Sequence, residues 1–237
     1  MSISYSVPRK DAVGKSSGET NYIADMQFEG MVYARTLRAD RPRAKILAID
    51  VPPLPEGYTI VDWRDVPGRN RMKQIFDDWP FLAEGVVNHI GEPILLVVGP
   101  EREVLDSLLA QIVVQYEDLP PILSLEAAEG RRRHHAERCE ESDSSEPYPP
   151  PIYGPDNCFA RYELVKGDPE AIFAQAASAG EGIRVIEATY TTGYQEHVYI
   201  EPQGFVGVVD GRGKVTVYGS LQCPYYVKRA LVELLGC

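Results

Sequence analysis

The chain is poor in cysteine. Its 237 residues include only four, Cys139, Cys158, Cys223 and Cys237, and no two of them form a C-x-x-C pair. This spacing excludes the usual zinc and thioredoxin-like motifs, and also an iron–sulfur cluster held by this chain alone, which would need closely spaced thiolates. Because nothing indicates a disulfide framework, we expect a reduced, cytoplasmic protein.

Long apolar runs and an excess of positive charge are lacking as well. No stretch approaches membrane-spanning length, and the first ten residues hold no apolar signal-peptide core. The formal net charge is −11, which argues against nucleic acid because phosphate binding needs clustered lysine and arginine. The one basic run, residues 131–135, is followed by acidic side chains and is predicted to be a solvated loop. We therefore expect neither a membrane nor a nucleic-acid partner.

Several common catalytic and nucleotide-binding motifs are missing too. The sequence contains no G-x-G-x-x-G, no P-loop, no G-x-S-x-G and no H-E-x-x-H. Interpretations as a dinucleotide-binding enzyme, a nucleotide hydrolase, a serine hydrolase or a zinc protease thus lack their basic signals.

What the sequence does contain is the composition of an ordinary globular protein, 44% hydrophobic and 25% charged. In residues 14–126, β-branched and apolar runs predict several strands, of which residues 94–98 are apolar throughout, as in a strand buried on both faces. An apolar stripe predicts a helix with Pro100 at its first position. This segment is therefore predicted to be an α+β unit. The predicted strands are residues 31–37, 44–49, 58–61, 94–98 and 113–117.

The composition changes at residues 127–157, where charged residues, then serines, then prolines predict an extended linker. The part that follows, residues 158–237, begins with a helix signal at Asp168-Pro169 and ends with a helix opened by Pro224 and capped by Gly236. Its few strands leave a sheet incomplete, so we expect an incomplete α+β domain. The predicted strands are residues 183–191, 205–209 and 215–218, with a turn at 210–213 between the last two.

Gln195-Glu196-His197 stands among strand formers in this second part. On a strand, Gln195 and His197 would face one way and Glu196 the other. The residues alone favour a polar strand end over a functional site. If the triplet is a site, a glutamine amide suits hydrogen bonding to an oxo or carbonyl oxygen rather than proton transfer.

The order of short motifs along nearly the whole chain resembles the molybdenum-binding subunit of the xanthine dehydrogenase and aldehyde oxidase family. The resemblance implies that residues 14–126 form the family's α/β hammerhead domain and that residues 158–237 begin its first molybdenum-cofactor domain. The motifs are Gly18-Glu19-Thr20-Asn21-Tyr22, Gly30-Met31-Val32-Tyr33-Ala34, Asp65-Val66-Pro67-Gly68, Gly91-Glu92-Pro93-Ile94, Gln195-Glu196-His197, Leu221-Gln222-Cys223-Pro224 and Leu234-Leu235-Gly236.

Such enzymes hydroxylate a purine, an N-heterocycle or an aldehyde at a molybdenum–pterin centre, molybdopterin or its cytosine dinucleotide, with oxygen from water. Their electrons leave through iron–sulfur clusters and FAD on partner domains or subunits. The family's glutamine hydrogen-bonds an oxygen ligand of molybdenum, and Gln195 matches it. The resemblance therefore implies that Gln195 binds the cofactor through this oxygen, in the second shell of the metal, while Glu196 and His197 are structural.

The chain also departs from the family pattern. The glycine-rich cofactor segment is absent, the general-base glutamate is expected beyond Cys237, and Glu92 stands where many relatives carry glutamine. We therefore expect an N-terminal fragment or split subunit that is inactive alone. Its partners would be the remainder of the molybdenum subunit, an iron–sulfur subunit and a FAD subunit. A non-catalytic assembly module and a degraded remnant remain alternatives.

Overall fold

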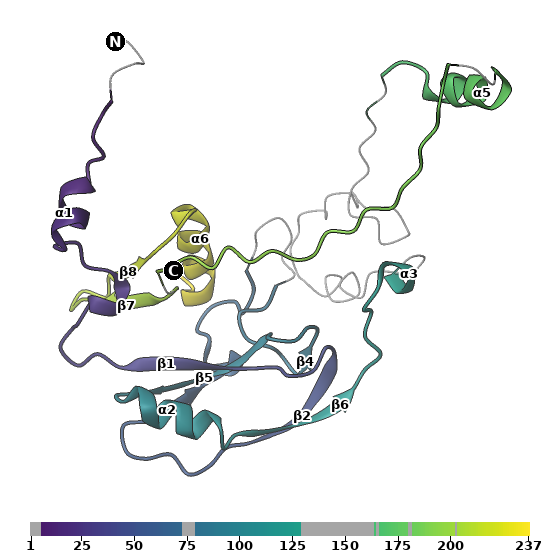
Figure 1. Ribbon diagram of the computed structural model, residues 1–237. Coiled ribbons are helices and arrows are strands. Elements are labelled where there is room, and N and C mark those ends of the chain that lie inside the picture. The colour runs from purple at the N-terminus through teal and green to yellow at the C-terminus, as the bar shows by residue number, and fades with distance from the viewer. Residues whose placement is uncertain (1–5, 73–78, 129–163, 165, 180–181, 202) are drawn as a thin grey trace. The chain divides into compact units, whose positions relative to one another are not determined.

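The computed structural model describes residues 6–72, 79–128, 164, 166–179, 182–201 and 203–237 (Figure 1). Most of the predicted linker, together with Cys139 and Cys158, lies outside the described residues. The chain divides into two compact units, one made mainly of Met1–Ser124 with Glu201–Cys237, the other mainly of Asp143–Ile200. Residues 201–237 thus pack with the first part of the chain, and the domain boundaries inferred from the sequence stay a prediction.

Two antiparallel three-stranded sheets form the centre of the first unit. The expected strands are confirmed with small shifts in their ends, and β4 was missed because two residues carry no alternation to read. One sheet has the order β1 (Tyr33–Arg38), β5 (Pro93–Gly99), β3 (Thr59–Val61), and the other has the order β4 (Val86–Val87), β2 (Ala44–Asp50), β6 (Val113–Asp118).

The core lies on β5, as its apolar run predicts. Ile94, Leu95 and Val97 are at most 2% exposed, and Leu105 and Leu108 of α2 (Arg102–Leu109) are buried in the same cluster. The predicted helix start at Pro100 is wrong, because Glu101 is the N-cap and the helix begins at Arg102. Strand pairing explains the shift, since β5 continues to Gly99, which still pairs with Tyr33 of β1.

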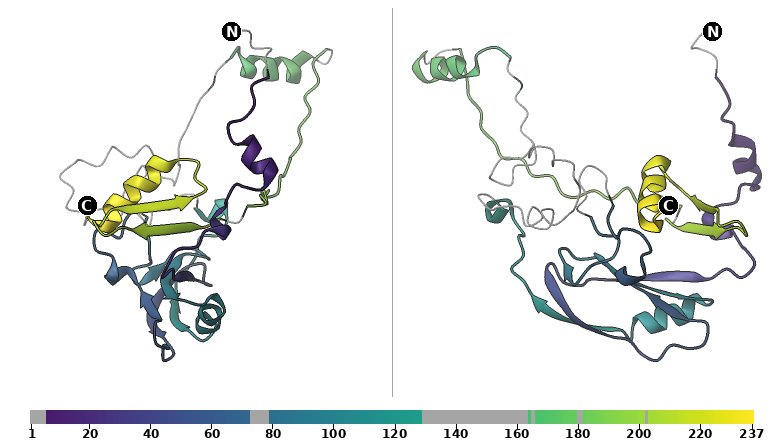
Figure 2. Two further views of the ribbon diagram at one scale, coloured as in Figure 1. Left: turned by 90° about the vertical axis from the view of Figure 1, so that its left-hand side faces the viewer. Right: turned by 180° about the vertical axis from the view of Figure 1, so that it is seen from behind.

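The C-terminal part of the first unit is a hairpin and a helix. β7 (Phe205–Val209) and β8 (Val215–Gly219) pair antiparallel, and the Asp210 carboxylate closes the turn by accepting the N–H groups of Arg212 and Lys214, both at 2.9 Å. α6 (Pro224–Leu235) ends at Gly236, whose φ of 70° is left-handed. Both elements are confirmed, and Figure 2 shows α6 beside the hairpin.

The second unit contains α5 (Pro169–Ala179), whose predicted N-cap is confirmed because the Asp168 carboxylate accepts the N–H of Ala171 at 3.0 Å. It also contains α3 (Leu125–Ala128).

Four short helices of the described chain were not predicted, since each is too brief for a periodic pattern to show. They are α1 (Ala12–Ser17), η1 (Ile23–Asp25), η2 (Trp63–Asp65) and α3.

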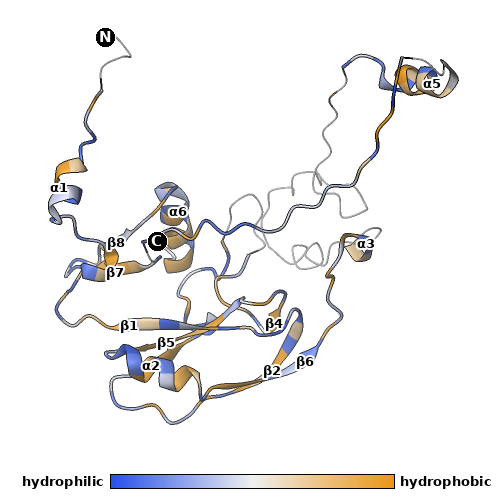
Figure 3. Cartoon of the chain, in the orientation of Figure 1, coloured by the Kyte–Doolittle hydropathy of each residue, from blue (hydrophilic) through white to orange (hydrophobic). Residues whose placement is uncertain are grey.

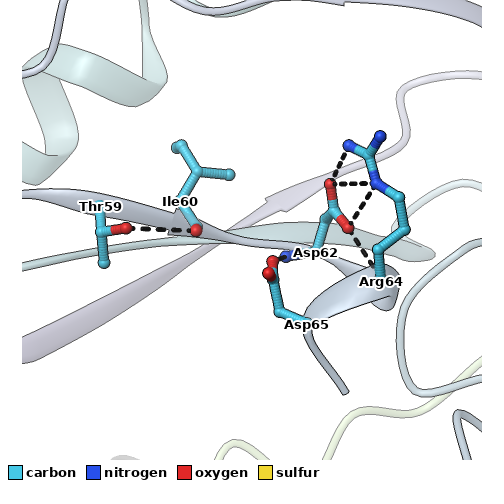
Figure 4. Close-up of polar contacts among 5 residues, drawn as sticks. All are labelled: Thr59, Ile60, Asp62, Arg64 and Asp65. Carbon is cyan, nitrogen blue, oxygen red and sulfur yellow. Dashed lines mark hydrogen bonds and ion pairs between the residues drawn. The ribbon is translucent and has the colours of Figure 1, made fainter. Parts of the chain in front are cut away.

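Asp62 organises the chain after β3 (Figure 4). Its carboxylate accepts the Arg64 N–H at 2.8 Å, and the Asp65 carboxylate accepts the Asp62 N–H at 2.8 Å, which completes a capping box around η2. The Arg64 guanidinium also hydrogen-bonds the Asp62 carboxylate and lowers the pKa of that carboxyl below its ordinary value.

We expect Asp62→Asn to remove the contribution of this carboxylate to the pH dependence of the free energy of unfolding, while its side-chain oxygen can still cap η2. Since the pKa of Asp62 is depressed in the folded state, the charged form stabilises the fold above the unfolded pKa, and this stabilisation is lost as pH falls through the folded pKa. Denaturant unfolding at about pH 7 and about pH 3 measures the difference. The difference in free energy of unfolding between wild type and variant should become smaller on acidification, whereas a difference that does not change with pH would contradict the role of Arg64.

Asp62→Ala should lower the free energy of unfolding by about 1 kcal/mol at neutral pH, because the capping oxygen is lost.

A second prediction concerns Gly99, which lies against the ring of Tyr58. A Cβ on Gly99 would stand 2.2 Å from the Tyr58 Cδ1. Gly99→Ala should therefore lower the free energy of unfolding by roughly 1–3 kcal/mol through overpacking. The control is Gly207→Ala in β7, where nothing lies within 4 Å of the added Cβ, and its effect should be within about 0.5 kcal/mol. Equal stability of the two variants in thermal or denaturant unfolding would contradict the close approach.

Candidate functional site

Gln195 lies in an exposed segment rather than on a strand. Between α5 and β7, residues 183–199 form neither helix nor strand, and every described side chain from 182 to 200 is exposed. The predicted strand at 183–191 is therefore wrong, and so is the expectation that Gln195 and His197 share one face of a strand. A strand needs a neighbour to take its backbone hydrogen bonds, and no described residue pairs with this segment.

The three residues of the triplet differ in their contacts. The Glu196 carboxylate accepts the N–H of His197 at 3.0 Å and that of Val198 at 3.5 Å, so it shapes the local backbone. Val198 has a φ of 47°, a left-handed conformation that is uncommon for a β-branched residue. Within the described chain no hydrogen bond involves the Gln195 side chain. The structure thus gives Glu196 a local structural role and leaves the Gln195 amide available as a donor.

The same segment exposes large apolar side chains, and Figure 3 colours part of it as hydrophobic. Tyr194 and Ile200 are as exposed as in an isolated peptide, at 110% and 100%. Contiguous exposed apolar side chains usually mark a surface that another polypeptide or ligand covers. The exposed members are Ile183, Val185, Ile186, Tyr190, Tyr194, Val198, Tyr199 and Ile200.

The described residues hold no group of three or more His, Cys, Asp or Glu side chains that could bind a metal ion. Cys223 and Cys237 are free and exposed, and His134 and His135 lie outside the described part of the chain. Glu92 is buried and accepts the Asn88 N–H, so its role is to hold the turn at residues 88–92. Nor does any described helix combine the length and apolar character needed to cross a bilayer.

Comparison with known proteins decides the family. The model for the α/β hammerhead domain of aldehyde oxidase and xanthine dehydrogenase matches residues 17–120, and the model for the molybdopterin cofactor-binding domain matches residues 152–237. The chain belongs to the aldehyde oxidase and xanthine dehydrogenase family. The resemblance drawn from its short motifs is confirmed, and Gln195 falls within the matched cofactor-binding region.

Curated members of the family are similar over almost the whole chain. The chain is 32% identical to a probable xanthine dehydrogenase component from Bacillus subtilis over 92% of its own length and 27% of that protein. It is 29% identical to the nicotinate dehydrogenase large molybdopterin subunit of Eubacterium barkeri over 95% of its length and 49% of that protein. The chain therefore spans about half or less of the length of these relatives.

Solved structures confirm the α+β fold. Quinoline 2-oxidoreductase from Pseudomonas putida 86 superposes with a TM-score of 0.71 and 24% identity, covering 98% of this chain and 28% of that one. The aldehyde oxidoreductase from Desulfovibrio desulfuricans gives a TM-score of 0.70 at 22% identity, covering 98% and 25%. At these identities the similarity shows the fold alone.

Hydrogen–deuterium exchange tests the unpaired segment. In the isolated chain, amides of residues 183–200 should exchange at nearly the rate of an unstructured peptide, because almost none is hydrogen-bonded. His197 and Val198 should be slower, since their N–H groups donate to Glu196. Amides of the buried strand β5 serve as the protected reference. Protection at 183–191 comparable to that of β5 would show that the strand predicted from the sequence does form in solution.

Proposed function

We propose that this chain supplies one wall of the molybdenum site of a hydroxylase, with Gln195 as a hydrogen-bond donor to an oxygen ligand of the metal. The observation that carries the proposal is that the Gln195 amide, within a matched cofactor-binding region, has no hydrogen-bond partner among the described residues. A neutral amide can donate to an oxo or hydroxo group without transferring a proton.

The chemistry of the Gln195 amide, a neutral hydrogen-bond donor, fits a molybdenum–pterin group with an oxygen ligand. When bound, the group supplies hydroxylation of a purine, an N-heterocycle or an aldehyde with oxygen derived from water. The described residues offer that group the Gln195 amide as a donor and no metal-binding cluster. Gln195 would therefore orient and stabilise an oxygen ligand, and we assign it no role as the general base.

The partners proposed for this chain are the remaining part of the molybdenum subunit, an iron–sulfur subunit and a FAD subunit. Residues 183–200, which are rich in exposed apolar side chains and pair with no described strand, support the first of these, because such a segment is stabilised when other strands take its backbone hydrogen bonds. A non-catalytic assembly module is the second candidate, and the self-contained core around β5 favours it, since this core needs no cofactor.

Affinity purification of the tagged chain from its native cells tests the proposal. We expect molybdenum, a pterin, iron and flavin to co-purify with partner polypeptides. We also expect the fractions that contain this complex to hydroxylate purines or aldehydes. Partner chains without molybdenum would support the assembly module instead. Recovery of the tagged chain alone, without metal, would contradict both.

Substitution of Gln195 in that complex tests its role. Gln195→Ala should lower the hydroxylation rate by roughly 10²–10³-fold, the cost of removing one donor from a preorganised site. Gln195→Glu should lose a similar factor, because an ionised carboxylate accepts hydrogen bonds and cannot donate one. Gln203→Ala, also at an exposed glutamine, is the matched control and should keep full activity. Full activity of both Gln195 variants would contradict the assignment.

A further inference from the structure

The C-terminal end of α6 is closed by another part of the chain. The N–H of Gly68 donates to the carbonyl of Leu234 at 2.9 Å, and the N–H of Arg69 donates to the carbonyl of Glu233 at 2.8 Å. The last four carbonyls of an α-helix have no hydrogen-bond partner within the helix, so outside donors must satisfy them. Here two consecutive backbone amides, from a loop far away in the sequence, do so.

Gly68 permits this contact because it has no side chain. A Cβ at this position would stand 2.2 Å from the Glu233 carbonyl oxygen, 2.6 Å from the Gly236 nitrogen and 2.9 Å from the Leu234 carbonyl oxygen. These neighbours are backbone atoms at a helix end and cannot rotate away. The left-handed Gly236 turns the chain at the same place.

Two further features hold the loop at the helix end. The capping box around Asp62 and Asp65 fixes the backbone just before residues 66–69. The Arg69 guanidinium lies 3.9 Å from the Glu233 carboxylate, an exposed ion pair that adds little by itself. A separate contact joins the same two regions at the hairpin that precedes α6, where the ring of Tyr218 lies beside that of Phe28, with centroids 5.8 Å apart.

We infer that residues 66–69 are the docking site through which the hammerhead region holds the cofactor-binding region, by accepting the C-terminal end of α6. The loop lies within the hammerhead match, residues 17–120, and α6 lies within the cofactor-binding match, residues 152–237. The partner of this surface is thus a helix C-terminus whose last carbonyls have no acceptor role within the helix itself. Gly68 cannot be replaced by another residue type without displacing this helix end. The inference does not depend on the chemistry proposed for Gln195.

Gly68→Ala in the full chain tests the docking site. Loss of the two backbone hydrogen bonds should speed exchange of the α6 amides by about 30-fold, while amides of β5 keep their protection. Trypsin should then cleave faster after the exposed Lys228 and Arg229 of α6. The control is Gly211→Ala, in a turn where nothing lies within 4 Å of the added Cβ, and it should change neither readout.

Unchanged α6 exchange in Gly68→Ala would overturn the inference. Equal loss of protection in β5 would overturn it too, because Gly68 would then support the hammerhead core rather than the helix. A double-mutant cycle with Gly236→Ala gives an independent check. If both substitutions release the same helix end, the double variant should exchange no faster in α6 than the more affected single variant. Additive effects would overturn the docking role, since the two glycines would then act separately.

Discussion

Every backbone amide and carbonyl removed from water needs a hydrogen-bond partner, and this constraint explains which described segments form regular secondary structure. In the first unit the requirement is met by strand pairing on both sides of β5. It is met again where the amides of Gly68 and Arg69 close the end of α6. Residues 183–200 have the composition of a strand but no neighbour among the described residues, so they stay exposed and irregular.

The same constraint connects the fold to the proposed function. A segment whose backbone and apolar side chains are both unpaired can be covered by additional polypeptide without any change in the rest of the chain. Gln195 lies on that segment, so the environment of its amide would be set by whatever covers it. In the isolated chain the amide is surrounded by water, in which a donor contributes far less than it does in a dry, preorganised site.

Much of the fold could be predicted from the sequence. β5 was recognisable from its unbroken apolar run, the β7–β8 hairpin from its Asp-Gly turn, and α6 from Pro224 and Gly236 at its ends. These signals work because each depends on residues close together in the chain. The same reasoning failed for residues 183–191, where strand formers are present and a pairing partner is absent from the described chain. It also misplaced the start of α2, because pairing of Gly99 with Tyr33 prolongs β5.

The sequence by itself determined the family, the α+β class and the identity of the candidate donor Gln195, since ordered motifs and local patterns carry that information. Only the tertiary structure showed that Asp65-Val66-Pro67-Gly68 and Leu234-Leu235-Gly236, far apart in the chain, meet at one helix end. No local pattern could reveal this, because the requirement on Gly68 comes from the carbonyls of a helix more than a hundred residues away. The tertiary structure likewise showed that no described residue forms a hydrogen bond with the Gln195 side chain, which no local sequence pattern could reveal.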